Sequence, residues 1–183
     1  MAASGSPEVS QTAVDILEAG GNAFDAALGA LCTASIAEPL LTSLGGGGFL
    51  LALPDGQKPR VYDFFCQTPR NKRSEKELDF YPIMANFGTA EQEFHIGMGS
   101  MAVPGVVAGI FEAHRELGRM SVAEIMAPAI GLARSGVVVD AFHHYIIRIL
   151  RPIMRATPES FALYESPEKP DELIREGELL CNS

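Results

Sequence analysis

The chain has 183 residues, of which 47% are hydrophobic and 20% charged, so it is long enough to bury the core of an ordinary globular domain. Its formal net charge is −9, which argues against a nucleic-acid partner, because binding a phosphate backbone needs a basic face. There is no run of about 18 apolar residues, so no membrane span is expected.

The cysteines and the first residues bear on the compartment. Cys32, Cys66 and Cys181 are odd in number and widely spaced, which does not predict a disulfide framework. Residues 1–5 lack the basic and apolar regions of a secretory signal. The expected location is therefore the cytoplasm, unless a leader has been removed.

Two helices are predicted first. Ser10 is interpreted as the N-cap of a helix over residues 11–19, and Asn22 as the N-cap of a second helix over residues 23–37. Asp25 is the only charged residue of the second helix, which is otherwise apolar almost all round. This composition is typical of a helix buried between two layers.

A β-hairpin is predicted next. Residues 49–53 are expected to form a buried strand, and Pro54-Asp55-Gly56 has strong turn chemistry. Residues 60–65 then return as the second strand of an antiparallel pair. Residues 1–70 are thus expected to hold helices plus a hairpin.

The remaining sequence is expected to form a loop-rich segment and then a helical one. Residues 71–100 are polar and irregular, and the neighbouring basic residues Arg70, Lys72 and Arg73 are expected to form a solvated face. Helical patterns dominate residues 101–183. Three helices are expected there. One covers 105–117, and one covers 140–155. The helix between them is opened by a capping box of Ser121 with Glu124, breaks or restarts at Pro128, and continues as helix over 127–135.

The order helix, helix, hairpin, helices predicts an α+β fold with an antiparallel sheet covered by helices. Two strands are too few for a stable sheet, and the apolar second helix needs partners on both sides. Part of the fold is therefore expected to lie outside this chain.

The glycine run Gly45, Gly46, Gly47 and Gly48 is the most unusual local feature. A phosphate-binding loop needs the order strand, glycine loop, helix, whereas here a helix precedes the run and a strand follows it. A nucleotide-binding loop is therefore disfavoured and would need a measured nucleotide affinity. We expect these glycines to be structural and to let a strand pack closely against another segment.

No pattern in the sequence predicts a metal or cofactor site. His95, His114, His143 and His144 show no metal-ligand spacing. Cys66 with a distant histidine is a candidate nucleophile pair, although a single cysteine at the end of a strand is more often structural.

Several blocks, in order over most of the chain, resemble the start of the large subunit of γ-glutamyltranspeptidases. The sequence GGNAFDAA within residues 16–27 and the sequence LGGGGF at residues 44–49 resemble the most specific family patterns. The other matching blocks are Glu38-Pro39, residues 103–109 and residues 128–136.

The resemblance implies an N-terminal nucleophile (Ntn) hydrolase fold, an αββα sandwich of which this chain would supply the helix-rich N-terminal portion with an antiparallel hairpin. Members are made as a precursor that cuts itself before a threonine, which then attacks the γ-amide of glutathione-like substrates with its own α-amine as base. The implied partners are a small-molecule amide or γ-glutamyl substrate and the remainder of the precursor, including the small subunit.

The nucleophile is the first departure from the family pattern. None of the threonines Thr12, Thr33, Thr42, Thr68, Thr89 and Thr157 has the family's Thr-Thr-His-like context, so no catalytic residue is assigned in this chain. Because the chain stops in mid-pattern at residues 181–183, it is interpreted as a fragment, a truncated gene or one part of a cut precursor. The chain alone is expected to be inactive.

The second departure is in the substrate-binding segment. Residues 63–69 stand where the family usually has D-x-R-E-x-x-P, so Phe65 takes the place of the arginine that binds the substrate α-carboxylate, and Cys66 that of the glutamate. A phenyl ring offers no hydrogen-bond donor to a carboxylate. The candidate substrate-binding residues are Phe65, Cys66, Gln67 and Arg70, although Arg70 is more simply a surface residue.

These observations favour part of an amide hydrolase or acyltransferase. The alternatives are an acylase for a substrate other than a γ-glutamyl compound, and a non-catalytic family member that serves as a scaffold. A downstream Thr-Thr-His-like segment would distinguish a catalytic from a non-catalytic protein.

Overall fold

The computed structural model describes residues 1–181, which form two compact units. The first unit comprises residues 1–67 and 103–135, and contains α1 (Pro7–Glu18), α2 (Ala23–Ala37), β1 (Phe49–Ala52), β2 (Arg60–Asp63), α3 (Val106–Leu117) and α4 (Val122–Ser135). The second comprises residues 68–102 and the chain from Gly136 onward. It contains η1 (Glu75–Glu77), β3 (Tyr81–Asn86), β4 (Glu91–Ile96), η2 (Met98–Ser100), β5 (Val137–Val138), α5 (Ala141–Ile149), α6 (Arg151–Met154), α7 (Pro158–Leu163) and β6 (Leu179–Leu180).

Helix α1 begins earlier than the sequence analysis predicted. Ser6, not Ser10, is the N-cap, and its Oγ accepts a hydrogen bond from the Val9 N–H at 3.3 Å. Pro7 occupies the first helical position, where its missing N–H costs no hydrogen bond. The expected N-cap at Ser10 is therefore wrong, and Ser10 lies inside the helix.

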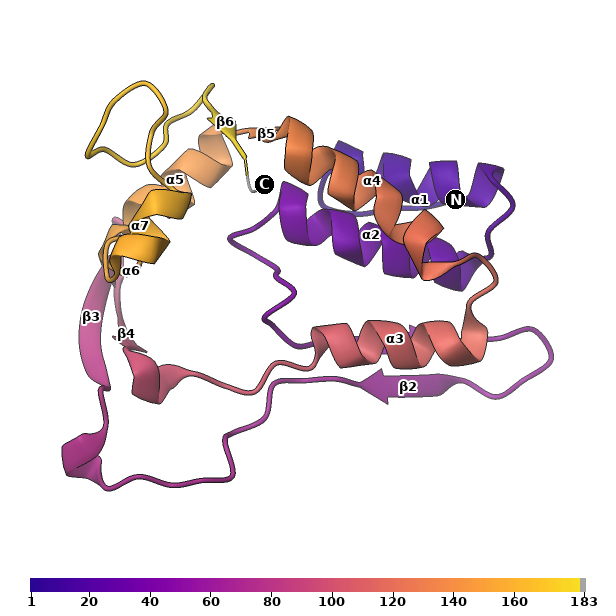
Figure 1. Ribbon diagram of the computed structural model, residues 1–183, viewed down its shortest axis with the longest axis horizontal. Coiled ribbons are helices and arrows are strands. Elements are labelled where there is room, and N and C mark those ends of the chain that lie inside the picture. The colour runs from indigo at the N-terminus through magenta and orange to yellow at the C-terminus, as the bar shows by residue number, and fades with distance from the viewer. Residues whose placement is uncertain (182–183) are drawn as a thin grey trace. The chain divides into compact units, whose positions relative to one another are not determined.

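Helix α2 has the predicted bounds and the predicted burial. The Asn22 Oδ1 accepts hydrogen bonds from the N–H groups of Phe24 and Asp25, and the Asp25 carboxyl group accepts one from the Asn22 N–H. The helix packs against both α1 and α4 (Figure 1). The core of this unit consists of Ala13, Ile16, Ala26, Leu28, Cys32, Val106, Ile110, Ala113, Ile125 and Ala129.

Cys32 acts as a small apolar side chain in the core of the first unit. It is 3% exposed, and burial raises the pKa of its thiol above the usual value. The thiolate form is therefore disfavoured, which is the opposite of what a reactive cysteine requires.

The Asp25 carboxyl group also joins α2 to the turn between α3 and α4. It is fully buried and accepts hydrogen bonds from the N–H groups of Arg119 and Met120, at 3.0 and 3.3 Å. The Asn22 side chain donates to the Leu117 carbonyl at 2.7 Å. The GGNAFDAA block thus fixes where α3 ends and α4 begins.

The predicted hairpin is confirmed, but its first strand is not buried on both faces. Strands β1 and β2 pair antiparallel, with Leu51 opposite Val61. Side chains such as Leu50 and Tyr62 pack on the core beneath α3, whereas Phe49 and Leu51 are 63% and 70% exposed. One face of this sheet therefore has no cover in the first unit, and Figure 1 shows β2 running along α3.

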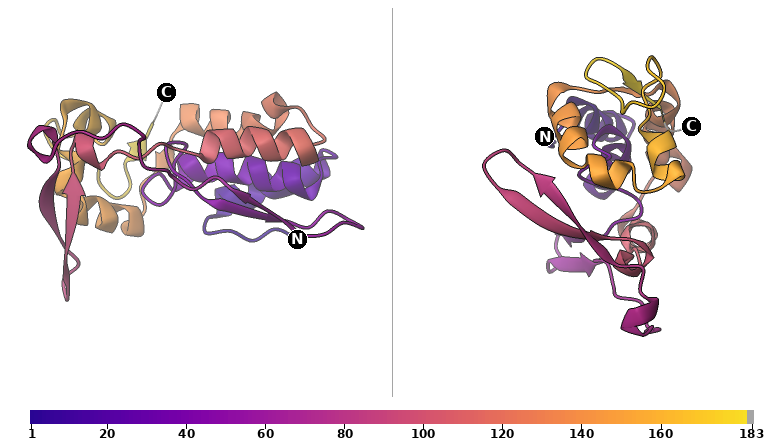
Figure 2. Two further views of the ribbon diagram at one scale, coloured as in Figure 1. Left: turned by 90° about the horizontal axis from the view of Figure 1, so that it is seen from below. Right: turned by 90° about the vertical axis from the view of Figure 1, so that its left-hand side faces the viewer.

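The segment 71–100 is not loop-rich as expected, because it contains the antiparallel pair β3 and β4. The two strands form a long twisted ribbon (Figure 2) with Tyr81 opposite Ile96. Gly88 adopts a φ of +89° in the turn, and its N–H donates to the Asn86 side chain. Apolar residues alternate with polar ones at the end of β4, where Phe94 and Ile96 are half-buried. The polar residues of this strand obscured that alternation in the sequence.

Two prolines act differently from the sequence-based expectation. Helix α4 opens with the predicted capping box of Ser121 and Glu124 but continues through Pro128 to Ser135 without a break. The helix expected over residues 140–155 is instead interrupted at Leu150. Pro152 lies just beyond and cannot supply the N–H that would continue α5.

None of the helices in residues 1–181 is long and apolar enough to cross a membrane.

Candidate functional site

The candidate substrate-binding segment, residues 64–67, continues from the end of β2. Phe64 and Gly48 exchange backbone hydrogen bonds of 3.1 and 3.3 Å, which extend the β1–β2 ladder by one pair. Gln67 exchanges two more with Val103, at 3.0 and 2.8 Å. The backbone of this segment is therefore held at both ends.

The glycine run lies directly against this segment. A Cβ added to Gly47 would lie 2.4 Å from the Cys66 nitrogen, which confirms the expected close approach of two backbones. At Gly46 the nearest atom would be the Ser43 carbonyl oxygen at 3.1 Å, and at Gly45 the nearest contact is 3.7 Å away. Only Gly47 in this group is positioned where no side chain fits.

The glycine run also contacts the N-terminus of α3. The contact is made by a backbone carbonyl of the run and not by its N–H groups. The Gly46 carbonyl accepts hydrogen bonds from the N–H groups of Gly105 and Val106, at 3.0 and 3.2 Å. A phosphate cradle would require free amides directed at the anion. The first donors of α3 are occupied here, so the structure gives the nucleotide-loop alternative no support.

The Phe65 side chain points outward on the uncovered face of the hairpin. It is 55% exposed and stacks on Phe49 with 5.6 Å between ring centroids and 15° between the ring planes. Its N–H donates to the Asp63 carboxyl group at 3.0 Å, which fixes the turn of the chain beyond β2. The ring does not belong to the core of the first unit.

Sequence reasoning missed Phe49 as a partner of Phe65. Alternation along β1 and β2 is the signal that could have placed both rings on one face. The role of Asp63 could be read from its position two residues before Phe65, since aspartate commonly accepts a hydrogen bond from the backbone two residues on.

Cys66 and Gln67 lie beside Phe65 but form no catalytic arrangement. Cys66 is half-buried against Gly47, while the exposed Gln67 contacts only the Phe65 carbonyl through its amide, at 3.4 Å. His114, the one histidine of the first unit, pairs its Nε2 with the Met120 carbonyl at 2.7 Å. The structure therefore provides no base for a Cys66 nucleophile within this unit.

Arg70 belongs to the second unit. Its side chain is exposed and makes no ion pair with any residue between 1 and 181. It remains a surface residue in the structure.

Three of the threonines have structural roles. The buried Thr33 hydroxyl donates to the Thr12 hydroxyl at 3.1 Å, between α2 and α1. Thr157 caps α7 by accepting a hydrogen bond from the Ser160 N–H at 3.1 Å.

In the part of the chain that the structure describes, no group of three or more His, Cys, Asp or Glu side chains could hold a metal ion.

Comparison with known proteins identifies clear relatives. The sequence profile described as Gamma-glutamyltranspeptidase matches residues 9–183. The chain is 35% identical over 127 residues to a glutathione hydrolase proenzyme of Pseudomonas aeruginosa, covering 69% of this chain and 22% of that protein. It is 36% identical over 138 residues to the Acylase ACY 1 proenzyme of Pseudomonas sp. strain SE83, covering 74% of this chain and 25% of that protein.

The fold is similar to that of a solved relative. The crystal structure of Helicobacter pylori γ-glutamyltranspeptidase superposes with a TM-score of 0.81 over 100% of this chain and 50% of that chain, at 23% identity. The chain spans about a quarter of the length of the curated relatives just named. The helices and small antiparallel sheets correspond to part of an α+β Ntn-hydrolase fold.

Proposed function

This chain belongs to the γ-glutamyltranspeptidase family, and we propose that it serves as the N-terminal part of the large subunit of an amide hydrolase or acyltransferase. The intact protein, meaning the whole precursor and its cut subunits, acts on a small-molecule amide. Its threonine nucleophile lies in the remainder of the precursor. The relatives named as proenzymes support the proposal that this chain is one part of a precursor and the nucleophile belongs to another part.

The uncovered face of the hairpin supports a partner from the remainder of the precursor. Phe49, Leu51, Val61 and Phe65 are all more than half exposed on this face. A two-stranded sheet is marginally stable in water, and a contiguous apolar patch of this kind is usually buried in the working protein. A second sheet laid on this face would complete a sandwich.

We propose further that Phe65 forms a wall of the acyl pocket, with Cys66 and Gln67 beside it. The single observation that carries this proposal is the outward, stacked position of the Phe65 ring at the place where the family has its carboxylate-binding arginine. An apolar wall disfavours a buried carboxylate. The substrate acyl group is therefore neutral near this wall. The relatives do not distinguish the two substrate classes, since identity is 36% to a protein named an acylase and 35% to one named a glutathione hydrolase.

Replacing Phe65 with arginine should move the preference of the intact protein toward γ-glutamyl substrates. The new guanidinium can donate two charge-assisted hydrogen bonds to a carboxylate, so the ratio of kcat/KM values for γ-glutamyl and neutral acyl anilides should rise by about 30-fold, or roughly 2 kcal/mol. Steady-state kinetics with both anilides measures the ratio.

Gln57→Arg is the matched control, because Gln57 is exposed in the turn of the same hairpin, outside the paired strands, and gains the same charge. It should leave the ratio unchanged. Efficient γ-glutamyl turnover by the unaltered protein would contradict the neutral pocket. An equal shift in the two variants would show that charge alone, rather than position 65, sets the preference.

The chain of 183 residues alone should not hydrolyse γ-glutamyl-p-nitroanilide. It offers no threonine in a catalytic setting and no base beside Cys66 within the first unit, and general-base catalysis requires such a contact. Release of p-nitroaniline by the purified chain is the measurement. Activity that persists through repeated purification and disappears in Cys66→Ser would instead identify Cys66 as the nucleophile.

A further inference from the structure

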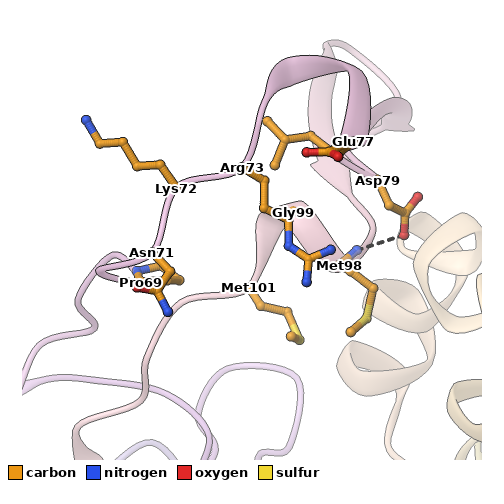
Figure 3. A pocket seen from close by; sticks show the side chains of 10 residues that line it. Pro69, Asn71, Lys72, Arg73, Glu77, Asp79, Met98, Gly99 and Met101 are labelled. Carbon is orange, nitrogen blue, oxygen red and sulfur yellow. Dashed lines mark hydrogen bonds between the residues drawn. The ribbon is translucent and has the colours of Figure 1, made fainter.

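A cavity of about 640 Å³ lies within residues 68–102 of the second unit, and its lining does not include Phe65, Cys66 or Gln67. It is bounded by the segment 69–73, by the end of η1 with the residues that follow, and by η2 (Figure 3). Its volume is in the usual range for a small-molecule site. Lys72 and Arg73 are exposed, as the sequence analysis expected, and both also line this open cavity.

The frame of the cavity is held by Asp79. The Asp79 carbonyl accepts a hydrogen bond from the Gly99 N–H at 2.7 Å, and its carboxyl group accepts one from the Met98 N–H at 2.9 Å. Gly97 adopts a φ of +100° so that the chain passes close to Asp79. These contacts fix η2 against the residues after η1.

The two acidic residues of the lining already have hydrogen-bond donors. Asp79 is held by the Met98 N–H, and the Glu77 carboxyl group accepts a hydrogen bond from the Ser74 hydroxyl at 2.9 Å. Arg73 makes no ion pair with any residue in the described part of the chain. Figure 3 shows its side chain extending toward Met98 and Met101, while Lys72 extends away from them.

We propose that this cavity binds a small organic anion with one carboxylate and a short apolar tail. The Arg73 guanidinium holds the carboxylate, because its fork of donors matches the two oxygens. The tail lies on Leu78, Met98 and Met101, whose side chains supply the apolar part of the lining. Glu77 and Asp79 repel further negative charge, which favours a monocarboxylate over phosphate.

Octanoate is a suitable probe of this site, and the methionines report its binding. In the intact protein labelled with ¹³C at the methionine methyl groups, Met98→Leu and Met101→Leu identify the two signals from the cavity. Octanoate should shift both signals saturably, with a Kd on the order of 1 mM for a ligand of this size. Octanamide, acetate and inorganic phosphate should each bind at least tenfold more weakly.

Variants of the basic residues test the role assigned to Arg73. Arg73→Gln should weaken octanoate binding at least tenfold, and Arg73→Lys should give an intermediate loss because it keeps the charge without the fork. Lys72→Gln and Arg70→Gln should change the Kd less than twofold. Because these side chains are exposed, all four variants should melt like the parent.

Three results would overturn the proposal. These are octanamide binding as tightly as octanoate, an unchanged Kd in Arg73→Gln, and no saturable shift of the two methionine signals. The site does not depend on amide hydrolysis, so it can fail while the proposed function stands.

Discussion

Replacing Asp25 with alanine should lower the free energy of unfolding by about 4 kcal/mol. The Asp25 carboxyl group is fully buried and accepts hydrogen bonds from the N–H groups of Asn22, Arg119 and Met120. Removing it leaves three donors without a partner in the interior, and each such group costs about 1 to 3 kcal/mol. Urea unfolding of the purified protein, followed by circular dichroism, measures the change.

The isosteric variant Asp25→Asn separates the loss of hydrogen bonds from the loss of volume. Its amide oxygen can still accept, but its NH₂ group would face backbone N–H groups, so a loss of about 2 kcal/mol is expected. Asp15→Ala is the control, because Asp15 is exposed and contacts only the Gln11 side chain. Its effect should stay within about 0.5 kcal/mol. If Asp25→Ala unfolds like Asp15→Ala, the buried junction does not stabilise the fold.

The sequence predicted best those elements whose ends carry their own hydrogen-bonding partners. Helix α2 has the predicted bounds because Asn22 and Asp25 bond reciprocally at its start. The capping box at Ser121 likewise opens α4 where expected. Local side-chain chemistry is enough to define such boundaries, whatever the helix packs against.

Tertiary contacts decided the elements that were missed. Strand β4 carries charged residues on its exposed face, so its sequence resembles that of a polar loop. Its pairing with β3, whose Ala85 is fully buried, is a tertiary contact that the sequence of β4 does not reveal. Pro128 was expected to break a helix, yet α4 continues because Ile125 and Ala129 are buried in the core on either side of it. Packing of this kind overrides a local preference and leaves no signal in a short window.

The candidate site was predictable in position but not in geometry. The resemblance placed Phe65 at the substrate end of the hairpin, and the antiparallel pairing is confirmed. That the Phe65 ring stacks on Phe49 follows from register, which the sequence left open. Arg73 is exposed as expected, but its place in a cavity was not predictable, because the approach of η2 to its segment depends on contacts between Asp79 and residues 98–99.

Gly47→Val should destabilise the protein by about 3 kcal/mol or more, because the backbones of the glycine run and the substrate-binding segment meet at this residue. A Cβ on Gly47 would lie 2.4 Å from the Cys66 nitrogen and 2.9 Å from the Phe65 Cα. Relief requires residues 64–67 to move away, which breaks the Gly48–Phe64 pairing. Differential scanning calorimetry and urea unfolding measure the loss.

The neighbouring glycines provide a graded comparison for Gly47→Val. Gly46→Val should cost about 1 kcal/mol or more, since the closest atom to its Cβ would be the Ser43 carbonyl oxygen at 3.1 Å. Gly45→Ala, whose nearest contact is 3.7 Å away, should be neutral to within about 0.5 kcal/mol. Because Cys66 and Phe65 move with the clash, any Gly47→Val protein that remains folded should also show altered acyl-substrate preference, whereas Gly45→Ala should not. Equal stability of the Gly47 and Gly45 variants would show that the glycine run is a tolerant loop and not a packing contact.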